Sequence, residues 1–175
     1  EQVNLLAFHD TLTRLPNRRL LEDRLTQAMS ASHRSNHYGA LLFLDLDNFK
    51  PLNDLHGHGV GDLLLIEVAS RLKSCVREAD TAARFGGDEF VVLLCDLSTD
   101  AHAATDQAAS IAEKIRQSLS MPYWLSGSIE HRCTASIGVA LFKGREVDEK
   151  ALIDAADDAM YQAKQQGRNR VGFCP

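Results

Sequence analysis

The chain has 175 residues, of which 45% are hydrophobic and 25% charged, the proportions of an ordinary globular domain. This length supports one hydrophobic core but not two, so residues 1–175 are expected to form a single domain. The formal net charge of −5 excludes a general electrostatic attraction for nucleic acid, and no apolar stretch is long enough to cross a membrane.

Cysteine usage and the N-terminus indicate the compartment. Cys75, Cys95, Cys133 and Cys174 lack the paired spacing of a metal site, and we interpret them as reduced thiols of a cytoplasmic protein. The chain starts without a methionine or a signal-peptide pattern, so we expect a domain excised from a larger multidomain protein. That larger protein could be tethered to a membrane without any membrane contact by this domain itself.

Hydrophobic periodicity in the first half of the chain predicts three helices and one buried strand. The elements are a helix from its cap Asn17 to about Arg34, a strand over 40–44, a short helix capped by Asp47 or Asn48 with Pro51 in its first turn, and a long amphipathic helix over 60–76 after Gly57 and Gly59.

The second half predicts a hairpin, two further helices and more strands. These elements are strands 81–85 and 89–95, a helix over 101–119, one or two strands within 129–142, a helix over 148–166 ended by Gly167, and a short strand over 171–173. The hairpin requires antiparallel neighbours. The fold class is therefore α/β (α+β), with a mixed, partly antiparallel central sheet flanked by helices rather than a doubly wound parallel sheet.

The segment R-F-G-G-D-E-F, residues 84–90, joins the two hairpin strands. Its glycine pair permits the positive φ values that a tight turn requires. Asp88 and Glu89 follow at once beside a buried strand, where carboxylates cost stability unless a cation pairs with them. Because side chains alternate along a strand, we expect only one of the two to face such a cation.

Asp45 ends the apolar strand 40–44, where ligands of open α/β sheets gather. If this strand pairs with strand 90–95, Asp45 and Asp88 come close enough to share Mg²⁺ (or Mn²⁺), which typically takes one or two carboxylates plus phosphate oxygens and water. An isolated Asp at this position would be interpreted as a helix cap. The predicted closeness of Asp88 favours the metal site.

Polar residues after Asp45 suit a nucleotide. Asn48, Phe49 and Lys50 open the short helix, so their backbone N–H groups are free for a phosphate, and Lys50 adds a positive charge. Asn53 and Asp62 have the amide and carboxylate that can read the edge of guanine. The alternative, that Asn53, His58 and Asp62 are loop residues with Asp62 as an N-cap, stays open for any one of them.

Several motifs occur together and in order: H-D-T-L-T-R-L-P-N-R-R from His9, F-L-D-L-D-N-F-K-P-L-N-D, R-F-G-G-D-E-F, T-A-S-I-G-V-A, and G-R-N-R-V ending at Val171. Together they resemble the GGDEF domains, the diguanylate cyclases, over almost the whole chain. One departure is Arg14, at a position where the family commonly has glycine.

The resemblance implies roles for individual residues of the metal site. It assigns the metal to Asp45, the backbone carbonyl of Leu46, and Asp88. It also implies Asp88 as the acceptor of the attacking hydroxyl's proton. Glu89 matches the signature and, with Asp88 and Lys50, is expected to act in catalysis.

The resemblance also implies substrate and regulatory residues. It adds His58 to the substrate-binding positions of Asn53 and Asp62, and it directs Lys164 and Arg168 at the triphosphate. For the last two the alternative is cations favoured by a helix C-terminus. Arg77 and Asp80 form an R-x-x-D pair that matches the family's inhibitory product site, although an ordinary i,i+3 surface pair is equally consistent with the spacing.

The implied activity is condensation of two GTP molecules into cyclic di-GMP and two pyrophosphates by two facing copies of the domain, with feedback by the product and an upstream sensory domain. The implied fold is similar to the palm of nucleotide cyclases and polymerases. The alternative function is a catalytically silent receptor domain for GTP or cyclic di-GMP that regulates an attached output module.

Overall fold

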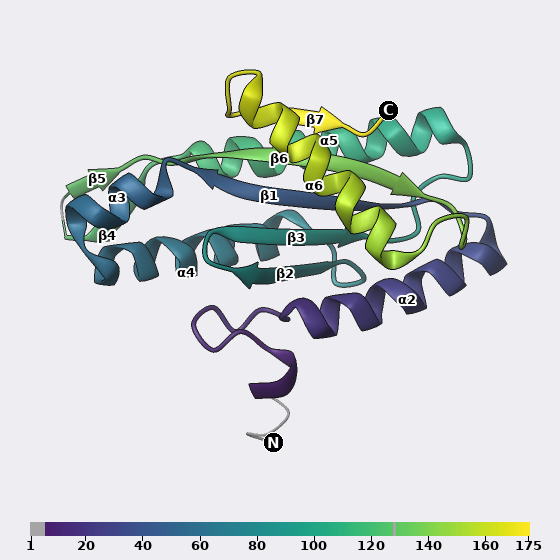
Figure 1. Ribbon diagram of the computed structural model, residues 1–175, viewed down its shortest axis with the longest axis horizontal. Helices are drawn as coiled ribbons and strands as arrows, with labels where there is room; N and C mark the ends of the chain where they lie inside the picture. Colours follow the sequence, from purple (N-terminus) through teal and green to yellow (C-terminus); the bar gives the residue numbers. More distant parts are fainter. Residues whose placement is uncertain (1–5, 128) are drawn as a thin grey trace.

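A five-stranded sheet forms the centre of the computed structural model, which describes residues 6–127 and 129–175 (Figure 1). The strand order is β2-β3-β1-β6-β7, and all neighbours are antiparallel except β6 and β7. The strands are β1 (Gly39–Asp47), β2 (Thr81–Gly86), β3 (Glu89–Leu94), β6 (Thr134–Phe142) and β7 (Val171–Phe173). The predicted mixed sheet and the predicted pairing of the first strand with the hairpin are confirmed.

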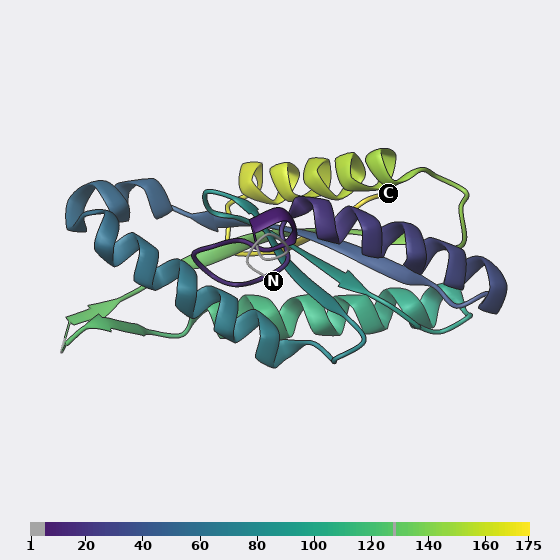
Figure 2. The same ribbon diagram turned by 90° about the horizontal axis from the view of Figure 1, so that it is seen from below.

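Helices cover both faces of this sheet, as Figure 2 shows edge-on. One face carries α2 (Arg18–Ser35) and α6 (Glu149–Gln165), and the other carries α4 (His58–Cys75) and α5 (Ala101–Ser120). The short helix α3 (Phe49–His56) follows β1 directly. Within the part of the chain that the structure describes, no helix is both long enough and apolar enough to span a membrane.

Strand β1 is buried on both sides, and its alternation decides which way the acidic residues point. Leu42 and Leu44 belong to the core under α4 and α5, whereas Leu41 and Phe43 belong to the core under α2 and α6. Since successive side chains of a strand alternate between faces, the two acidic residues at the end of β1 lie on the α2/α6 side.

The structure decides between the predicted caps of α3 and corrects the predicted cap of α4. Strand β1 continues through Asp47, whose side chain is buried, so Asp47 does not cap α3. Asn48 is the N-cap residue of α3, as one of the two predictions had it, although its backbone is left-handed and its side chain makes no capping hydrogen bond to the described residues. Helix α4 begins at His58 with Gly57 as its N-cap, so Asp62 lies inside the helix and the interpretation of Asp62 as a cap is wrong.

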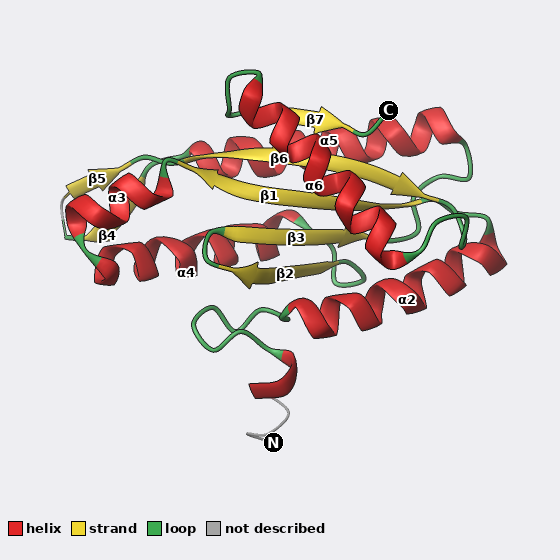
Figure 3. Ribbon diagram, in the orientation of Figure 1, coloured by secondary structure: helices red, strands yellow, loops and turns green. Residues whose placement is uncertain are grey.

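A second, two-stranded sheet was only partly foreseen. The predicted region 129–142 divides into β5 (Ile129–His131) and β6, and β5 pairs with β4 (Tyr123–Ser126), a strand that the sequence did not reveal (Figure 3). The ring of His131 in β5 packs edge-on against His56 of α3, with 4.8 Å between the ring centroids.

Close packing of α6 on β6 fixes where the C-terminal end of α6 lies. A Cβ atom at Gly138 of β6 would overlap the backbone oxygen of Ala156 and the backbone nitrogen of Met160. Only glycine therefore allows the helix to approach this strand so closely.

We expect Gly138→Ala to lower the free energy of unfolding by about 1–3 kcal/mol, because rigid backbone atoms must move to admit the methyl group. Gly59→Ala is the control, since among the described atoms none lies within 4 Å of its added Cβ and the residue is helical. That control should change stability by 0 to about +1 kcal/mol. Equal losses in urea unfolding of both variants would contradict the packing argument.

Candidate active site

The glycine hairpin is a tight turn held against β1. Gly86 (φ 143°) and Gly87 (φ 50°) supply the positive φ values, and Asp88 lies in the turn itself before β3 begins at Glu89. The backbone N–H of Leu46 donates to the carbonyl of Asp88 at 3.2 Å. The register also sets Asp45 directly opposite Glu89. The structure thus brings the predicted pair Asp45 and Asp88 together.

Asp45 lies in an electrostatically unfavourable position. Burial, the negative charge of Asp88 and a hydrogen bond shared with Asp88 raise the pKa of Asp45 to about 7, against a smaller opposing effect of Lys164. The Nζ atom of Lys164 is 3.4 Å from Asp45 Oδ2. The other oxygen, Oδ1, is buried, and the described residues offer it no hydrogen-bond partner. Such an oxygen is suited to a cation ligand.

This arrangement fits a divalent cation that is completed by its substrate. Among residues 6–127 and 129–175, no three His, Cys, Asp or Glu side chains gather closely enough to hold a metal by themselves. Two carboxylates are nevertheless what Mg²⁺ usually takes from a protein when phosphates and water supply the rest. The side chain of Leu46 is buried on the opposite face of the sheet, so only its backbone is available to the site.

Glu89 has surroundings of its own. Burial, together with the negative charges of Asp157 and Asp88, raises its pKa, while Arg18 and Lys164 act in the opposite direction. Asp157 and Arg18 belong to α6 and α2. Glu89 therefore faces the helices, on the same side of the sheet as Asp45, while Asp88 stays in the turn. Which of the two carboxylates faces a cation stays a prediction.

The ion pair between Arg84 and Asp10, which the sequence did not predict, stabilises the turn through its backbone. Arg84 donates from Nη2 and Nε to the carbonyl of Gly87 at 2.8 and 3.1 Å. Its Nη1 contacts both carboxylate oxygens of Asp10 at 3.0 and 3.2 Å. Both residues stand in quoted motifs, but 74 positions separate them, so only the fold reveals the contact.

Asp47 is a second missed residue. Its buried carboxylate accepts hydrogen bonds from Thr134 and Ser136 of β6, and from the backbone N–H of Asn169. Its Oδ1 is also 3.6 Å from Lys164 Nζ. The only sequence signal is the second Asp of D-L-D, which the helix-cap interpretation concealed.

The residues predicted to bind the base come from two successive helices. Asn53 of α3 and His58 of α4 share a contact of 3.0 Å between Nδ2 and Nδ1. A Cβ atom on Gly61 would overlap Asn53 Oδ1, so this glycine lets α3 and α4 approach at Asn53. Asn53 Oδ1 is buried with no partner among the described residues, and Asp62 is exposed one residue after Gly61.

The three predicted cations, Lys50, Lys164 and Arg168, differ in their contacts with the acidic end of β1. Lys164, in the last turn of α6, contacts both Asp45 and Asp47. Arg168 is exposed in the following turn, with φ 63°. Lys50 is exposed in the first turn of α3, next to Phe49.

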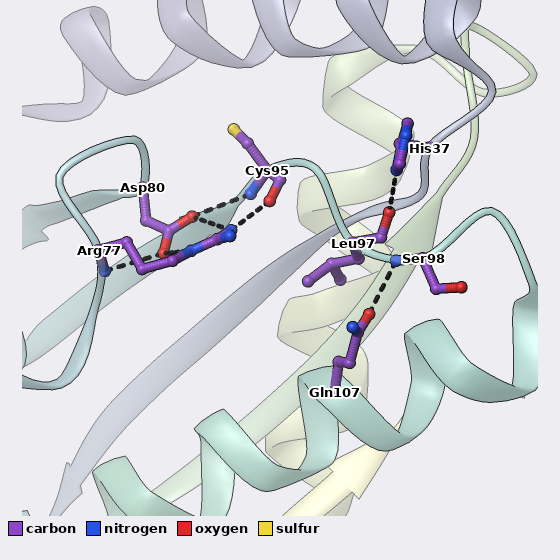
Figure 4. A network of polar contacts seen from close by, with 7 residues as sticks. All are labelled: His37, Arg77, Asp80, Cys95, Leu97, Ser98 and Gln107. Atoms are coloured by element: carbon purple, nitrogen blue, oxygen red, sulfur yellow. Dashed lines mark hydrogen bonds and ion pairs between the residues drawn. The ribbon is translucent and has the colours of Figure 1, made fainter.

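The R-x-x-D pair forms a tight local network, drawn in Figure 4. The Asp80 carboxylate is fully buried and accepts from the backbone N–H of Arg77 and of Cys95, each at 3.0 Å. The guanidinium of Arg77 donates to the same carboxylate at 3.1 and 3.2 Å and to the carbonyl of Cys95. The side chain of Arg77 is still 54% exposed, so it can also face a ligand.

A surface cavity of about 260 Å³ adjoins this pair. Arg24 and Lys73 line it beside Arg77 and Asp80, and neither was predicted from the sequence. Arg24 also donates from Nη1 to Thr81 Oγ1 at 3.3 Å. Three cations line the cavity together with two acidic residues, Glu78 and Asp80, and the carboxylate of Asp80 is already paired with Arg77. The remaining excess of positive charge suits an anionic ligand.

Comparison with known proteins identifies the family of this domain. The family model described as "Diguanylate cyclase, GGDEF domain" matches residues 7–170. The chain belongs to the GGDEF domain family of diguanylate cyclases, as its motifs suggested, and the expected fold class is confirmed.

Three relatives illustrate the match. The bifunctional diguanylate cyclase/cyclic di-GMP phosphodiesterase MucR of Pseudomonas aeruginosa is 52% identical over 97% of this chain, which spans only 23% of MucR. The solved GGDEF domain of TpbB from the same species is 40% identical, with a TM-score of 0.87 and coverage of 95% of this chain and 94% of that one. The coiled coil and GGDEF domain of DgcB from Caulobacter crescentus, solved with cyclic di-GMP, is 31% identical, with a TM-score of 0.87 and coverage of 98% and 88%.

We expect Asp45→Asn to stabilise the metal-free protein at pH 8. The folded-state pKa of about 7 exceeds the ordinary value of 3.8, so the folded state binds more protons between these values. The parent therefore loses stability as pH rises from about 4 to about 7, and the uncharged variant does not. With a discount for solvent screening, the variant should unfold about 2–4 °C higher at pH 8.

Thermal unfolding of both proteins at pH 5 and pH 8, in the presence of a chelator, checks this expectation. Asp54→Asn, an exposed carboxylate of α3, is the control for the change in net charge. A difference between Asp45→Asn and the parent that is the same at both pH values would contradict the repulsion described above.

Proposed function

We propose that this domain is an active diguanylate cyclase that condenses two GTP molecules into cyclic di-GMP and two pyrophosphates, with Mg²⁺ or Mn²⁺ as cofactor. The observation that carries the proposal is the acidic end of β1 at the glycine turn. The negative charge of Asp88 helps raise the pKa of Asp45, and Asp45 Oδ1 is buried without a partner among the described residues. Such a pair is costly in a protein that binds no cation.

The residues that would hold the cation are Asp45, Asp88 and the backbone of Leu46. When bound, the metal would lower the pKa of the attacking hydroxyl and neutralise charge on the phosphates. Asp88, in the turn, is the residue that we propose accepts the proton of the 3′-hydroxyl, and Glu89 supports it from the α2/α6 side. Lys164 lies 3.4 Å from Asp45 and can exchange this carboxylate for a phosphate oxygen.

The rest of the substrate is assigned to the neighbouring helices. Lys50 and the free N–H groups of Asn48 and Phe49 begin α3, where a phosphate is favoured by the helix dipole. Arg168 follows Lys164 in the turn after α6.

Guanine would lie between α3 and α4. Asp62 can accept hydrogen bonds from N1–H and N2–H₂ of guanine, which adenine does not offer. Asn53 adds an amide, held by His58 at 3.0 Å. A site that hydrogen-bonds guanine leaves its polar groups unpaired against adenine, so we propose selectivity for GTP over ATP.

Two copies of the domain must act together. The 3′-oxygen of each GTP attacks the α-phosphorus of the other, a P–O bond forms, the bond to pyrophosphate breaks, and the proton leaves to the base. One domain that holds one GTP cannot make both bonds, so we propose a homodimer of facing domains.

The chain spans only 23% of its relative MucR, which therefore carries further segments. We also propose that the whole protein has an upstream sensory domain. A GTP substrate and the free cysteine thiols support a cytoplasmic domain.

Asp88→Asn should reduce cyclic di-GMP formation from GTP and Mg²⁺ by at least about 100-fold, since a metal ligand and the proposed base are lost together. The measurement is chromatography of the products at fixed enzyme concentration. Asp54→Asn makes the same change of charge on an exposed carboxylate of α3 and should keep parental activity.

Near-normal synthesis by Asp88→Asn would refute this mechanism. A parent protein that binds GTP with Mg²⁺ but forms no cyclic di-GMP at any enzyme concentration would instead support a silent receptor domain.

We further propose that cyclic di-GMP binds beside Arg77 and Asp80 and inhibits the enzyme. The support is the exposed guanidinium of Arg77 at a cavity that Arg24 and Lys73 also line. The planar guanidinium of Arg can donate two parallel hydrogen bonds, which both a phosphate and the edge of guanine can accept.

Arg77→Ala should relieve inhibition by added cyclic di-GMP while the initial rate stays within about twofold of the parent, because Arg77 lies outside the proposed catalytic residues. Asp80 is a poor target, since its buried carboxylate holds two backbone N–H groups and its loss would destabilise the loop. Initial rates with and without product decide the question. Equal inhibition of variant and parent would leave Arg77 and Asp80 as a structural ion pair.

A further inference from the structure

Asp47 connects three separate parts of the chain through one buried carboxylate. Its side chain is only 1% exposed, and Oδ1 accepts from Ser136 Oγ at 2.7 Å. Oδ2 accepts from Thr134 Oγ1 at 2.7 Å and from the backbone N–H of Asn169 at 3.0 Å. A buried carboxylate is tolerated when its oxygens are satisfied in this way. Asp47 therefore anchors the turn after α6 to the end of β1 and to β6.

The anchored turn has an unusual backbone. Gly167, Arg168 and Asn169 all have positive φ values, of 126°, 63° and 46°. Two successive non-glycine residues in this region are strained, and such strain persists only where surrounding contacts hold it. Three contacts hold the turn. The backbone N–H of Arg168 donates to the carbonyl of Ala163 at 3.1 Å, the backbone N–H of Asn169 donates to Asp47, and Arg116 Nη1 donates to Asn169 Oδ1 at 2.7 Å.

The same carboxylate also acts on the cation that precedes the turn. Lys164 Nζ is 3.6 Å from Asp47 Oδ1 and 3.4 Å from Asp45 Oδ2, so it lies between two carboxylates of one strand. Of these two, Asp45 belongs to the proposed cation site. The other contacts of the Asp47 carboxylate are hydrogen bonds to the protein itself. Asp47 can therefore stay paired with Lys164 when a cation binds Asp45.

We propose that Asp47 is a positioning residue for the triphosphate: it fixes the peptide between Arg168 and Asn169 and the ammonium of Lys164, and so presents both cations to the phosphates of GTP. This inference rests on the proposed function for the identity of the ligand. Asp47 itself touches neither substrate nor metal. Its removal should weaken binding of the phosphates and spare binding of the base.

The test uses Asp47→Asn in the same 175-residue chain. The first measurement is hydrogen exchange of the amides of 167–170 in the absence of nucleotide. The second is the dissociation constant of the α,β-methylene analogue of GTP, which cannot release pyrophosphate, in comparison with that of guanosine, which has no phosphate.

The variant should exchange the Asn169 amide roughly tenfold faster or more and should bind the analogue roughly tenfold more weakly, as expected for loss of a charge-assisted hydrogen bond. Binding of guanosine should stay within about twofold of the parent, because α3 and α4 do not depend on this turn. Asp148→Asn, which alters the N-cap at the opposite end of α6, is the control and should leave the ratio of the two affinities unchanged.

Thr134→Val supplies a second variant if Asp47→Asn folds poorly, since it removes one donor that orients Oδ2 and keeps the carboxylate. It should shift the ratio in the same direction by a smaller factor. Equal weakening of the analogue and guanosine, or unchanged affinity for both, would overturn the inference alone. A parent protein that does not bind the analogue at all would overturn the proposed function, and hydrogen exchange would then decide separately whether Asp47 holds the turn.

Discussion

Two acidic residues, Asp45 and Asp88, lie close together at the end of β1, and the pairing of the central strands keeps them there. The register of β3 against β1 sets Glu89 opposite Asp45, and the bond from Leu46 N–H to the Asp88 carbonyl holds the turn close to β1. A slip of one residue would move the acidic side chains to the wrong face. The pairing of the buried strands therefore sets the backbones of Asp45 and Asp88 close to each other.

Neighbouring elements hold this unfavourable contact in place. Arg84 joins the carbonyl of Gly87 to Asp10 near the N-terminus, and α6 approaches β6 at Gly138, so that Lys164 lies over the acidic end of β1. The raised pKa of Asp45 means that its ionised carboxylate destabilises the folded protein. The packing of the surrounding elements offsets this loss of stability. Such local conflict inside a consistent fold is typical of functional sites.

Local pattern was enough to predict most of the fold, because periodicity, the Asn17 cap and the glycine turn are properties of neighbouring residues. What failed depended on distant partners. Asp47 has the residue type and the sequence position of a helix cap. Its hydrogen-bond partners, however, are 87 or more residues away, on β6 and after α6. Strand β4 is four residues long and too short for a periodic signal. Arg14 adopts φ 66°, a left-handed conformation that glycine adopts more readily than arginine, which agrees with the glycine that the resemblance to the family implies at this position.

Anomalous diffraction from crystals grown with Mn²⁺ and a GTP analogue that cannot release pyrophosphate would test the proposed cation site directly. Mn²⁺ takes the same oxygen ligands as Mg²⁺ and is visible by its anomalous signal. We expect a peak at about 2.1 Å from carboxylate oxygens of both Asp45 and Asp88, with the phosphates on its other side. Bound nucleotide with a Mn²⁺ peak that touches neither carboxylate would contradict it.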